Sequence, residues 1–334
     1  MKVNNKKKIT AIIPTKNRSE YLTKFINNCE KSFRNLNYKI IIIDASNKEH
    51  HKKNKLLLKN KKIKIIKQKT KGIQIGCCEA LKYVKSKFVV FLYDDDELSK
   101  EINKIYSSNM ENEDLFSFGY GIVQNINSKV KFNKLKKIEI KKSNILLSYN
   151  GTSLSQYVKL KNTNKINLPV SPVCAAYKLS FLKYWKKKIF NFTKGNLFRY
   201  YFFFKKEVGP DLLIYLFSIM KAKKINFYLP YVAKFSSHEN SISIIYGPNF
   251  LRIGYWLARI CFYENIEKID PEIKNRLFTY LFLTGLYLLF TNIFNYFYFK
   301  NILKELIKLL RSKENKFIFK YSYEVIKFRI LKYV

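Results

Sequence analysis

Four short runs of mainly apolar residues alternate with helix-like segments through the first hundred residues of the chain. The apolar runs cover residues 9–14, 38–44, 61–66 and 88–93. Segments 19–33 and 72–84 carry apolar residues at helical spacing. This alternation is typical of βαβ units, in which the strands form a mainly parallel sheet covered by helices. The sequence therefore predicts an α/β fold whose strands are buried on both faces.

Polar residues follow three of these predicted strands at the point where each strand ends. They are residues 15–18 after the first strand, 44–46 after the second and 94–96 after the fourth. In open α/β sheets the ligand lies outside the carboxyl ends of the strands. We therefore expect these three segments to line one crevice.

Three adjacent aspartates, Asp94, Asp95 and Asp96, form the most acidic of these segments. Without a cation, adjacent carboxylates raise one another's pKa and destabilise the turn that carries them. Mg²⁺ and Mn²⁺ take carboxylate oxygens, usually together with substrate phosphates. A solvated acidic turn is the alternative. The position of the cluster after a buried strand, beside two other polar strand ends, favours a site for Mn²⁺ or Mg²⁺.

Four segments of the chain carry a family resemblance. In the order AIIPTKNRSEYL, IIIIDASN, KGIQIGCCEAL and FVVFLYDDDEL, they resemble the N-terminal half of a family 2-type GT-A glycosyltransferase. The resemblance covers residues 9–100, and residues 101–245 by pattern alone. It implies a GT-A, Rossmann-like, mainly parallel sheet flanked by helices. It also implies sugar transfer from a nucleotide-diphospho-sugar, most simply a UDP-sugar, to an acceptor hydroxyl.

The same resemblance assigns roles to individual residues. Nucleotide contacts are implied for Pro14, Thr15, Asn17, Arg18, Asp44, Gly72, Gln74 and Asp94, with Asp44 contacting the base. Asp94 is expected near the ribose and the metal, and Asp96 as a direct metal ligand. Considered alone, Arg18 is either a phosphate donor or a surface arginine, Asp44 is either a ligand contact or a helix N-cap, and Gly72 is either a ligand contact or a turn residue.

Inverting members of this family place a carboxylate at the start of a helix, where it removes the proton from the acceptor hydroxyl. The candidate is Asp211 in EVGPDLLIYL, with helix capping as its alternative role. Pro210 departs from the usual Glu-Asp pair, which leaves Glu207 as a second candidate base. His238 in SSHENS is either a third metal ligand or a structural histidine.

From about residue 249 the chain is expected to be helical, and residues 277–299 contain no charged residue. A helix of that length, at ~1.5 Å per residue, would span the ~30 Å core of a bilayer. However, Thr284, Thr291, Asn292 and Asn295 place a polar stripe on it. We therefore predict an interfacial or partner-packed helical hairpin, with an ordinary buried bundle as the alternative.

These observations predict a glycosyltransferase domain over residues 1–248, with a nucleotide-binding half (1–110) and an acceptor half (111–248). The remaining helical region, 249–334, is expected to contact a membrane or to join copies of the chain as a homo-oligomer.

The formal net charge of +40 invites comparison with proteins that bind nucleic acid or anionic lipid. No aromatic-interleaved basic motif or zinc-finger spacing appears, so we predict no nucleic-acid partner. Five scattered cysteines are typical of free thiols, and the first apolar run is too short for a signal peptide. The prediction is a cytoplasmic protein with peripheral contact at the inner face of the cytoplasmic membrane.

The predicted function is metal-dependent, inverting and non-processive sugar transfer to a glycan or lipid-linked acceptor, in the synthesis of a bacterial surface glycan such as capsule or lipooligosaccharide. The QxxRW element of processive synthases is absent from the sequence. One alternative is a sugar nucleotidyltransferase, but its glycine-rich loop is missing from PTKNRS. The other is a non-catalytic basic protein that binds membranes or nucleic acid.

Overall fold

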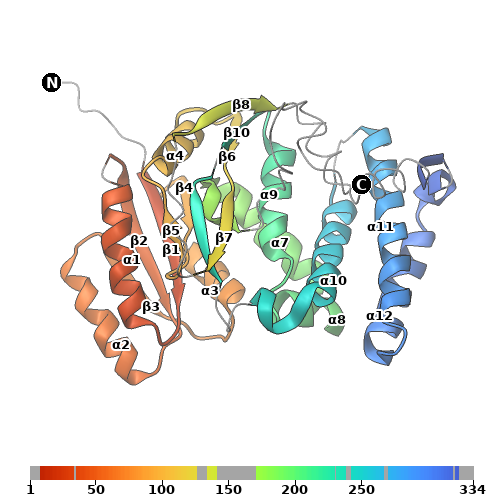
Figure 1. Cartoon of the computed structure of the whole chain (residues 1–334), viewed down its shortest axis with the longest axis horizontal. Coiled ribbons are helices and arrows are strands. Elements are labelled where there is room, and N and C mark those ends of the chain that lie inside the picture. Colours follow the sequence, from red (N-terminus) through yellow and green to blue (C-terminus); the bar gives the residue numbers. More distant parts are fainter. Residues whose placement is uncertain are drawn as a thin grey trace.

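The computed structural model describes residues 8–33, 35–125, 134–140, 171–229, 231–237, 242–266, 270–318 and 320–322. Figure 1 shows a sheet surrounded by helices at one end of the molecule and long C-terminal helices at the other. The predicted α/β class, with a mainly parallel central sheet and a helical C-terminal region, is confirmed.

The central sheet has the strand order β3-β2-β1-β4-β9. Its parallel strands are β1 (Lys8–Thr15), β2 (Asn37–Asp44), β3 (Ile63–Lys67) and β4 (Phe88–Phe91). The short edge strand β9 (Tyr177–Lys178) is antiparallel to β4. The four parallel strands are the four apolar runs of the sequence, so this part of the prediction is confirmed.

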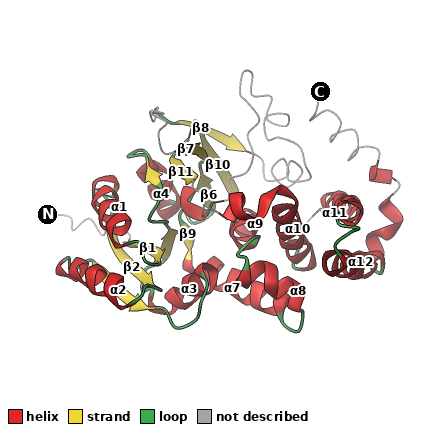
Figure 2. Ribbon diagram, turned by 60° about the horizontal axis from the view of Figure 1, so that its bottom comes forward, coloured by secondary structure: helices red, strands yellow, loops and turns green. Residues whose placement is uncertain are grey.

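Helices cover both faces of the central sheet, as Figure 2 shows. Helices α1 (Ser19–Ser32) and α4 (Ile102–Glu111) pack on one face, in the apolar cluster that contains Ile13. Helices α3 (Ile73–Ala80) and α7 (Leu179–Thr193) pack on the other face, in the cluster that contains Ile12. Successive side chains of a strand point to opposite faces, so a strand covered on both sides must be apolar throughout.

Helix α2 (Lys48–Lys55) was not predicted. Its sequence, KEHHKKNK, has no apolar residue and therefore no helical periodicity to detect. The helix begins after Asn47, whose side chain accepts a hydrogen bond from the His50 backbone N–H at 3.0 Å. Short 3₁₀ turns follow α2 at Leu56–Lys59 and α3 at Leu81–Tyr83.

Segments 114–123 and 226–235 each have a continuous apolar pattern typical of one strand, but each forms two strands. One small sheet contains β6 (Leu115–Phe118), β10 (Lys224–Leu229) and β8 (Lys136–Ile140), and another contains β5 (Glu97–Leu98), β11 (Ala233–Ser237) and β7 (Gly121–Asn125). The first break lies at Gly119, where an added Cβ would stand 2.9 Å from a Val232 methyl group. Because Gly119 and Val232 approach closely, the chain can pass from one small sheet to the other at this point. A continuous apolar pattern in the sequence does not reveal this break.

The remaining helices extend the fold away from the sheet. They are α8 (Leu197–Tyr200) with the π-helical turn Tyr201–Lys205, α9 (Pro210–Lys221), α10 (Ile242–Glu264), α11 (Pro271–Thr291) and α12 (Tyr296–Leu310), with 3₁₀ turns at Pro172–Cys174 and Lys313–Phe317. Helix α10 is kinked at Gly247, next to the domain boundary predicted at residue 248. One apolar cluster continues from Ile12 of β1 to Leu306 of α12, so the two predicted regions share a core.

Helices α11 and α12 form the hairpin predicted over residues 277–299. Asn292 donates to the Leu288 carbonyl at 2.8 Å, and the Asn295 side chain accepts from the Tyr298 backbone N–H at 3.1 Å. The polar residues that interrupt the apolar segment therefore end one helix and start the next. Within the described ranges, no helix combines the length and the apolar character needed to cross a bilayer.

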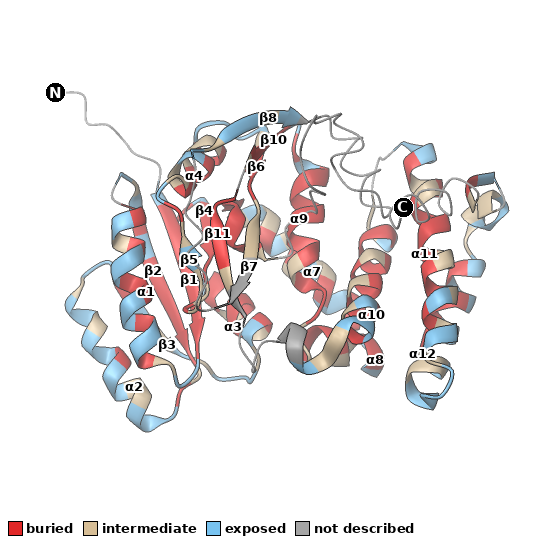
Figure 3. Cartoon of the chain, viewed as in Figure 1, coloured by how far each residue is buried: buried red, intermediate tan, exposed pale blue. Residues whose placement is uncertain are grey.

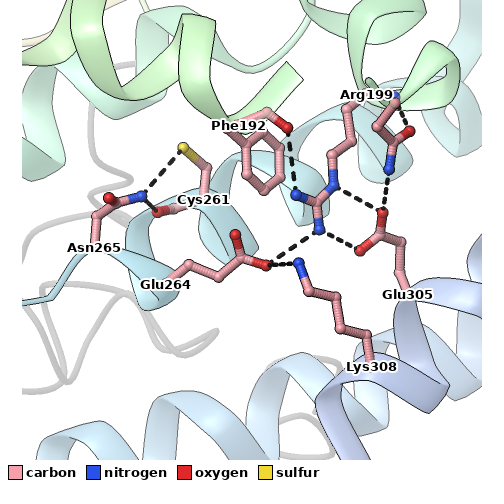
Figure 4. A network of polar contacts seen from close by, with 8 residues as sticks. Phe192, Arg199, Cys261, Glu264, Asn265, Glu305 and Lys308 are labelled. Carbon is pink, nitrogen blue, oxygen red and sulfur yellow. Dashed lines mark hydrogen bonds and ion pairs between the residues drawn. The ribbon is translucent and has the colours of Figure 1, made fainter. Parts of the chain in front are cut away.

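A buried ion-pair network ties the hairpin to the rest of the molecule (Figure 4). Arg199 of α8 and Glu305 of α12 are 5% and 3% exposed. The Arg199 guanidinium donates to both Glu305 oxygens, at 2.8 and 2.5 Å, and to Glu264 of α10 at 3.1 Å. Lys308 also donates to Glu264, at 2.7 Å. Three helices distant in the sequence are thus joined by one guanidinium group.

We expect Arg199→Ala to destabilise the protein by about 3–5 kcal/mol, because it leaves the Glu305 carboxylate buried without its charged partner and with only the hydrogen bond from Asn196. Urea unfolding followed by circular dichroism measures this change. Lys53→Ala, which removes an exposed ion pair with Glu49, is the control and should leave the midpoint unchanged. Equal midpoints for the two variants would contradict a structural role of the network.

Candidate active site

The ends of β1 and β4 meet through hydrogen bonds between Thr15, Arg18 and the aspartate cluster. The Thr15 hydroxyl donates to Asp94 Oδ2 at 2.6 Å. Arg18 Nη1 donates to Asp94 Oδ1 at 3.3 Å and to Asp95 Oδ2 at 2.8 Å. The structure therefore brings together the predicted polar ends of the first and fourth strands. Arg18 balances part of the charge of this cluster.

The end of β2 joins the same edge of the sheet. Asn17, with a left-handed φ of 54°, donates its backbone N–H to Ser46 Oγ at 2.8 Å. Its side chain accepts from the Asn47 N–H at 2.9 Å. Asparagine tolerates this backbone conformation better than most residues. Pro14 is buried within β1, opposite Ile43 of β2.

Asp44 is fully buried at the end of β2, where its carboxylate organises the following loop and helix. It accepts hydrogen bonds from the Ser46 N–H at 2.8 Å and from Asn54 at 3.0 Å, and it lies 2.7 Å from His51 Nδ1. Burial acts to raise the pKa of Asp44, but these hydrogen bonds outweigh burial and hold the pKa below its ordinary value. A contact between Asp44 and a nucleotide base stays a prediction.

The two candidate bases, Glu207 and Asp211, contact Gln74 at the start of α3, although they lie more than 130 positions further along the chain. The Gln74 N–H donates to Glu207 Oε1 at 3.2 Å, and the Gln74 side-chain amide donates to Asp211 Oδ1. Gly72 adopts a φ of 117°, and a Cβ there would stand 3.0 Å from Glu207 Oε1. Glycine at position 72 therefore permits the close approach of Glu207. Glu207 itself has a left-handed φ of 61°, a strained conformation of the kind that gathers at functional sites.

The pKa of Asp211 is raised to about 7, mainly by burial, with a further contribution from the charge of Glu207 that the Gln74 hydrogen bond opposes. Burial also raises the pKa of Glu207, against the hydrogen bonds from the backbone of Gln74 and Ile73. A carboxylate that titrates near pH 7 is suited to accepting a proton from a hydroxyl group. Asp211 is the second residue of α9, where the helix N-terminus favours its ionised form.

Tyr93 directly precedes the aspartate cluster in the chain. Burial raises the pKa of its hydroxyl well above the ordinary value, and the charges of Asp211, Asp96 and Glu207 raise it further. Tyr93 is therefore influenced by the charges of both the aspartate cluster and the candidate bases. Tyr93 was not predicted as a site residue, and its only signal in the sequence is its place immediately before Asp94.

A divalent cation fits the chemistry of Asp96. Its Oδ2 atom is buried and has no hydrogen-bond partner among the described residues. Burial, followed by the charges of Asp95 and Asp94, raises the pKa of Asp96 well above the ordinary value. A cation would remove this unfavourable state, and carboxylate oxygens suit Mg²⁺ and Mn²⁺. In the described part of the chain, no group of three His, Cys, Asp or Glu side chains is arranged around a common metal position. His238 lies outside the described residues.

Comparison with known protein families decides what kind of site this is. The model of glycosyl transferase family 2 matches residues 10–185, more than half of the chain. The chain belongs to glycosyl transferase family 2. It is thus a nucleotide-sugar glycosyltransferase, as its sequence segments indicate, and the matched region contains the aspartate cluster and the start of α3.

Solved structures support the GT-A fold of this glycosyltransferase. The crystal structure of S. aureus TarS 1–349 has a TM-score of 0.58 and 16% identity, covering 97% of this chain and 87% of that chain. TarS 1–349 in complex with UDP-GlcNAc has the same TM-score, identity and coverage. Its complex with UDP has a TM-score of 0.52 and 17% identity, covering 82% of this chain and 70% of that chain. No curated protein matches the chain.

We expect Gln74→Leu to slow the glycosyltransferase and to shift the acidic limb of its pH–rate profile to higher pH. The lost hydrogen bond stabilises ionised Asp211, so the pKa of Asp211 rises further and the active base forms at higher pH. We expect a shift of about one unit, measured on kcat. Asn60→Ala, which removes a surface amide paired with Glu30, is the control. An unchanged profile would mean that Gln74 does not tune Asp211.

Proposed function

We propose that the protein transfers one sugar per event from a nucleotide-diphospho-sugar to an acceptor hydroxyl, with inversion at the anomeric carbon and with Mn²⁺ or Mg²⁺. The observation that carries the proposal is the pairing of Glu207 and Asp211 through Gln74 at the start of α3, in a chain whose Asp96, after β4, has a buried and unpartnered carboxylate oxygen among the described residues. Asp96 suits a cation on the donor, and Glu207 and Asp211 suit removal of a proton from the acceptor.

The donor is proposed to lie along the strand ends, at Pro14, Thr15, Asn17, Arg18, Asp44, Gly72, Gln74 and Asp94. Arg18 pairs with Asp94 and Asp95, and a guanidinium group at this position suits a phosphate. Asp96, with Asp94 and His238, would hold the cation. When bound, a divalent cation neutralises the charge that develops on the leaving diphosphate.

Asp211 is proposed as the base that accepts the proton of the acceptor hydroxyl while that oxygen attacks the anomeric carbon. With a pKa of about 7, a large fraction of the Asp211 side chains is ionised near neutral pH, and the ionised carboxylate is basic enough to accept a proton. Gln74 orients the carboxylate through the hydrogen bond to Oδ1. Glu207 is the second candidate base, and its Oε1 atom accepts from the Gln74 N–H.

The first donor to test is a UDP-sugar, because TarS, which shares the fold, has been solved with UDP-GlcNAc and with UDP. The acceptor is proposed to be a glycan or a lipid-linked precursor of a bacterial surface glycan. The net charge of +40 supports peripheral contact with the anionic inner face of the cytoplasmic membrane, where such precursors are held. The alternative role proposed for residues 249–334 is to join copies of the chain through the C-terminal helices, in place of membrane contact.

A thermal-shift screen of nucleotide-sugars, each with and without Mn²⁺, tests the proposal. We expect one donor class to raise the melting temperature only when the cation is present, since ligand binding to the native state stabilises it. The absence of any response to every nucleotide-sugar with Mn²⁺ would favour a non-catalytic basic protein.

A further inference from the structure

Large apolar side chains are exposed where α11 turns into α12. The exposed fractions are 71% for Phe290, 55% for Ile293, 103% for Phe294 and 74% for Tyr296. Single exposed apolar residues are common on soluble proteins, but a contiguous group of this size marks an interaction site. Figure 3 shows this turn as an exposed projection at the lower end of the hairpin.

The start of α8 extends the same surface. Phe297 of α12 lies against Phe198 and Tyr201, with ring centroids 5.8 and 6.1 Å away. Leu197, which precedes Phe198, is 85% exposed. We call this surface the apolar apex, and it consists of Leu197, Phe290, Ile293, Phe294 and Tyr296.

Both segments that form the apolar apex lack acidic residues. No Asp or Glu occurs in residues 179–206 or 273–304 of the sequence. Exposed lysines flank the apex on both segments, at Lys194, Lys300 and Lys304. Aromatic side chains surrounded by cations are suited to an anionic lipid surface, where apolar groups enter the headgroup region and lysines contact acidic lipids.

We propose that the apolar apex docks onto an anionic bilayer, with Ile293 and Phe294 inserted among the lipid headgroups. A second copy of the chain is a poorer occupant, because pairing would bring together two surfaces of the same positive sign. The proposal deepens the peripheral membrane contact included in the proposed function by naming the surface that makes it, and it does not depend on sugar transfer.

Docking through the apolar apex also orients the enzyme. Figure 1 shows the turn between α11 and α12 on the same lower side of the molecule as the carboxyl ends of β1 and β3. The candidate active site lies at those strand ends. A bilayer bound at the apex would therefore face the side of the molecule on which an acceptor hydroxyl must arrive.

Co-sedimentation of the full chain with vesicles tests the proposal. One set of vesicles is pure phosphatidylcholine, and the other contains about one third phosphatidylglycerol, each at low and at high salt. We expect binding to the anionic vesicles at low salt, weakened about tenfold or more by the double variant Ile293→Ser/Phe294→Ser and by Lys300→Gln/Lys304→Gln. Leu56→Ser, at an apolar residue that is 65% exposed elsewhere, is the matched control and should bind like the wild type.

Two further measurements keep the outcomes distinct. Circular dichroism checks that each variant is folded, and nucleotide release from a donor without vesicles should be equal in wild type and Ile293→Ser/Phe294→Ser. Unchanged vesicle binding by that variant, or equal binding to neutral and anionic vesicles, would overturn the proposal. So would a wild-type dimer that the variant converts to monomer without any vesicle binding. A failure of donor turnover in all forms would instead count against the proposed function.

Discussion

Asp211→Asn should lower the rate of sugar transfer by about a hundredfold or more while donor binding remains close to that of the wild type. The amide keeps the shape of the side chain but cannot accept the acceptor proton. The wild-type rate should rise with pH through about 7, the pKa of Asp211, and this rise should be lost in the variant. Because Asp211 and Glu207 interact, the measured value belongs to the pair.

The same substitution distinguishes a base from a helix cap. The pKa of Asp211 is higher in the folded protein than in the unfolded chain, so this group destabilises the fold as pH rises from about 4 to about 7. Asp211→Asn should therefore raise the melting temperature at pH 8 and change it little at pH 4. If Asp211 served only as a cap, the variant would be less stable at pH 8. Glu207→Gln is the paired variant, and a larger loss of rate there would reassign the base.

Asp96→Asn should abolish cation-dependent donor binding without unfolding the protein. The buried Oδ2 atom of Asp96 has no partner among the described residues, and burial, followed by the charges of two neighbouring aspartates, raises the pKa of its carboxyl group. Replacing the carboxylate removes the ligand and relieves this repulsion, so the variant without metal should be at least as stable as the wild type. Calorimetric titration with UDP and Mn²⁺ should show a loss of affinity of about a hundredfold.

Glu97→Gln is the matched control for Asp96→Asn. Glu97 follows the aspartate cluster directly, but its carboxylate is exposed and pairs with Lys234 at 3.1 Å. The Glu97→Gln variant should bind UDP with Mn²⁺ as the wild type does. Equal losses of affinity for UDP in the two variants would indicate that negative charge in this region matters in general, and that Asp96 is not a specific ligand of the cation.

The fold could be predicted wherever one segment buries a complete face by itself. Strands β1 to β4 and helices α1, α3 and α9 have such patterns. Helix α2 could not be predicted, because its stability depends on the Asn47 cap and not on an apolar face. The breaks between β6 and β7 and between β10 and β11 depend on contacts with distant segments, which local periodicity does not encode.

The candidate site divides in the same way. The contact of Thr15 and Arg18 with Asp94 is possible because parallel strands end at one edge. Strand assignment alone predicted that these two segments line one crevice, but not the individual hydrogen bonds. The contacts of Gln74 with Glu207 and Asp211 depend on how α9 packs against α3, and spacing in the sequence carries no information on that packing. Likewise, His51 and Asn54 reach Asp44 only because α2 folds back over the end of β2.

The most direct test of the account is nucleotide release by the purified protein from the donor identified in the thermal-shift screen, measured with Mn²⁺ and with chelator. We expect release of the nucleoside diphosphate with Mn²⁺, none with chelator, and none from Asp96→Asn under either condition. Full release in chelator, or undiminished release by Asp96→Asn, would contradict the assignment of the aspartate cluster as the cation site of sugar transfer.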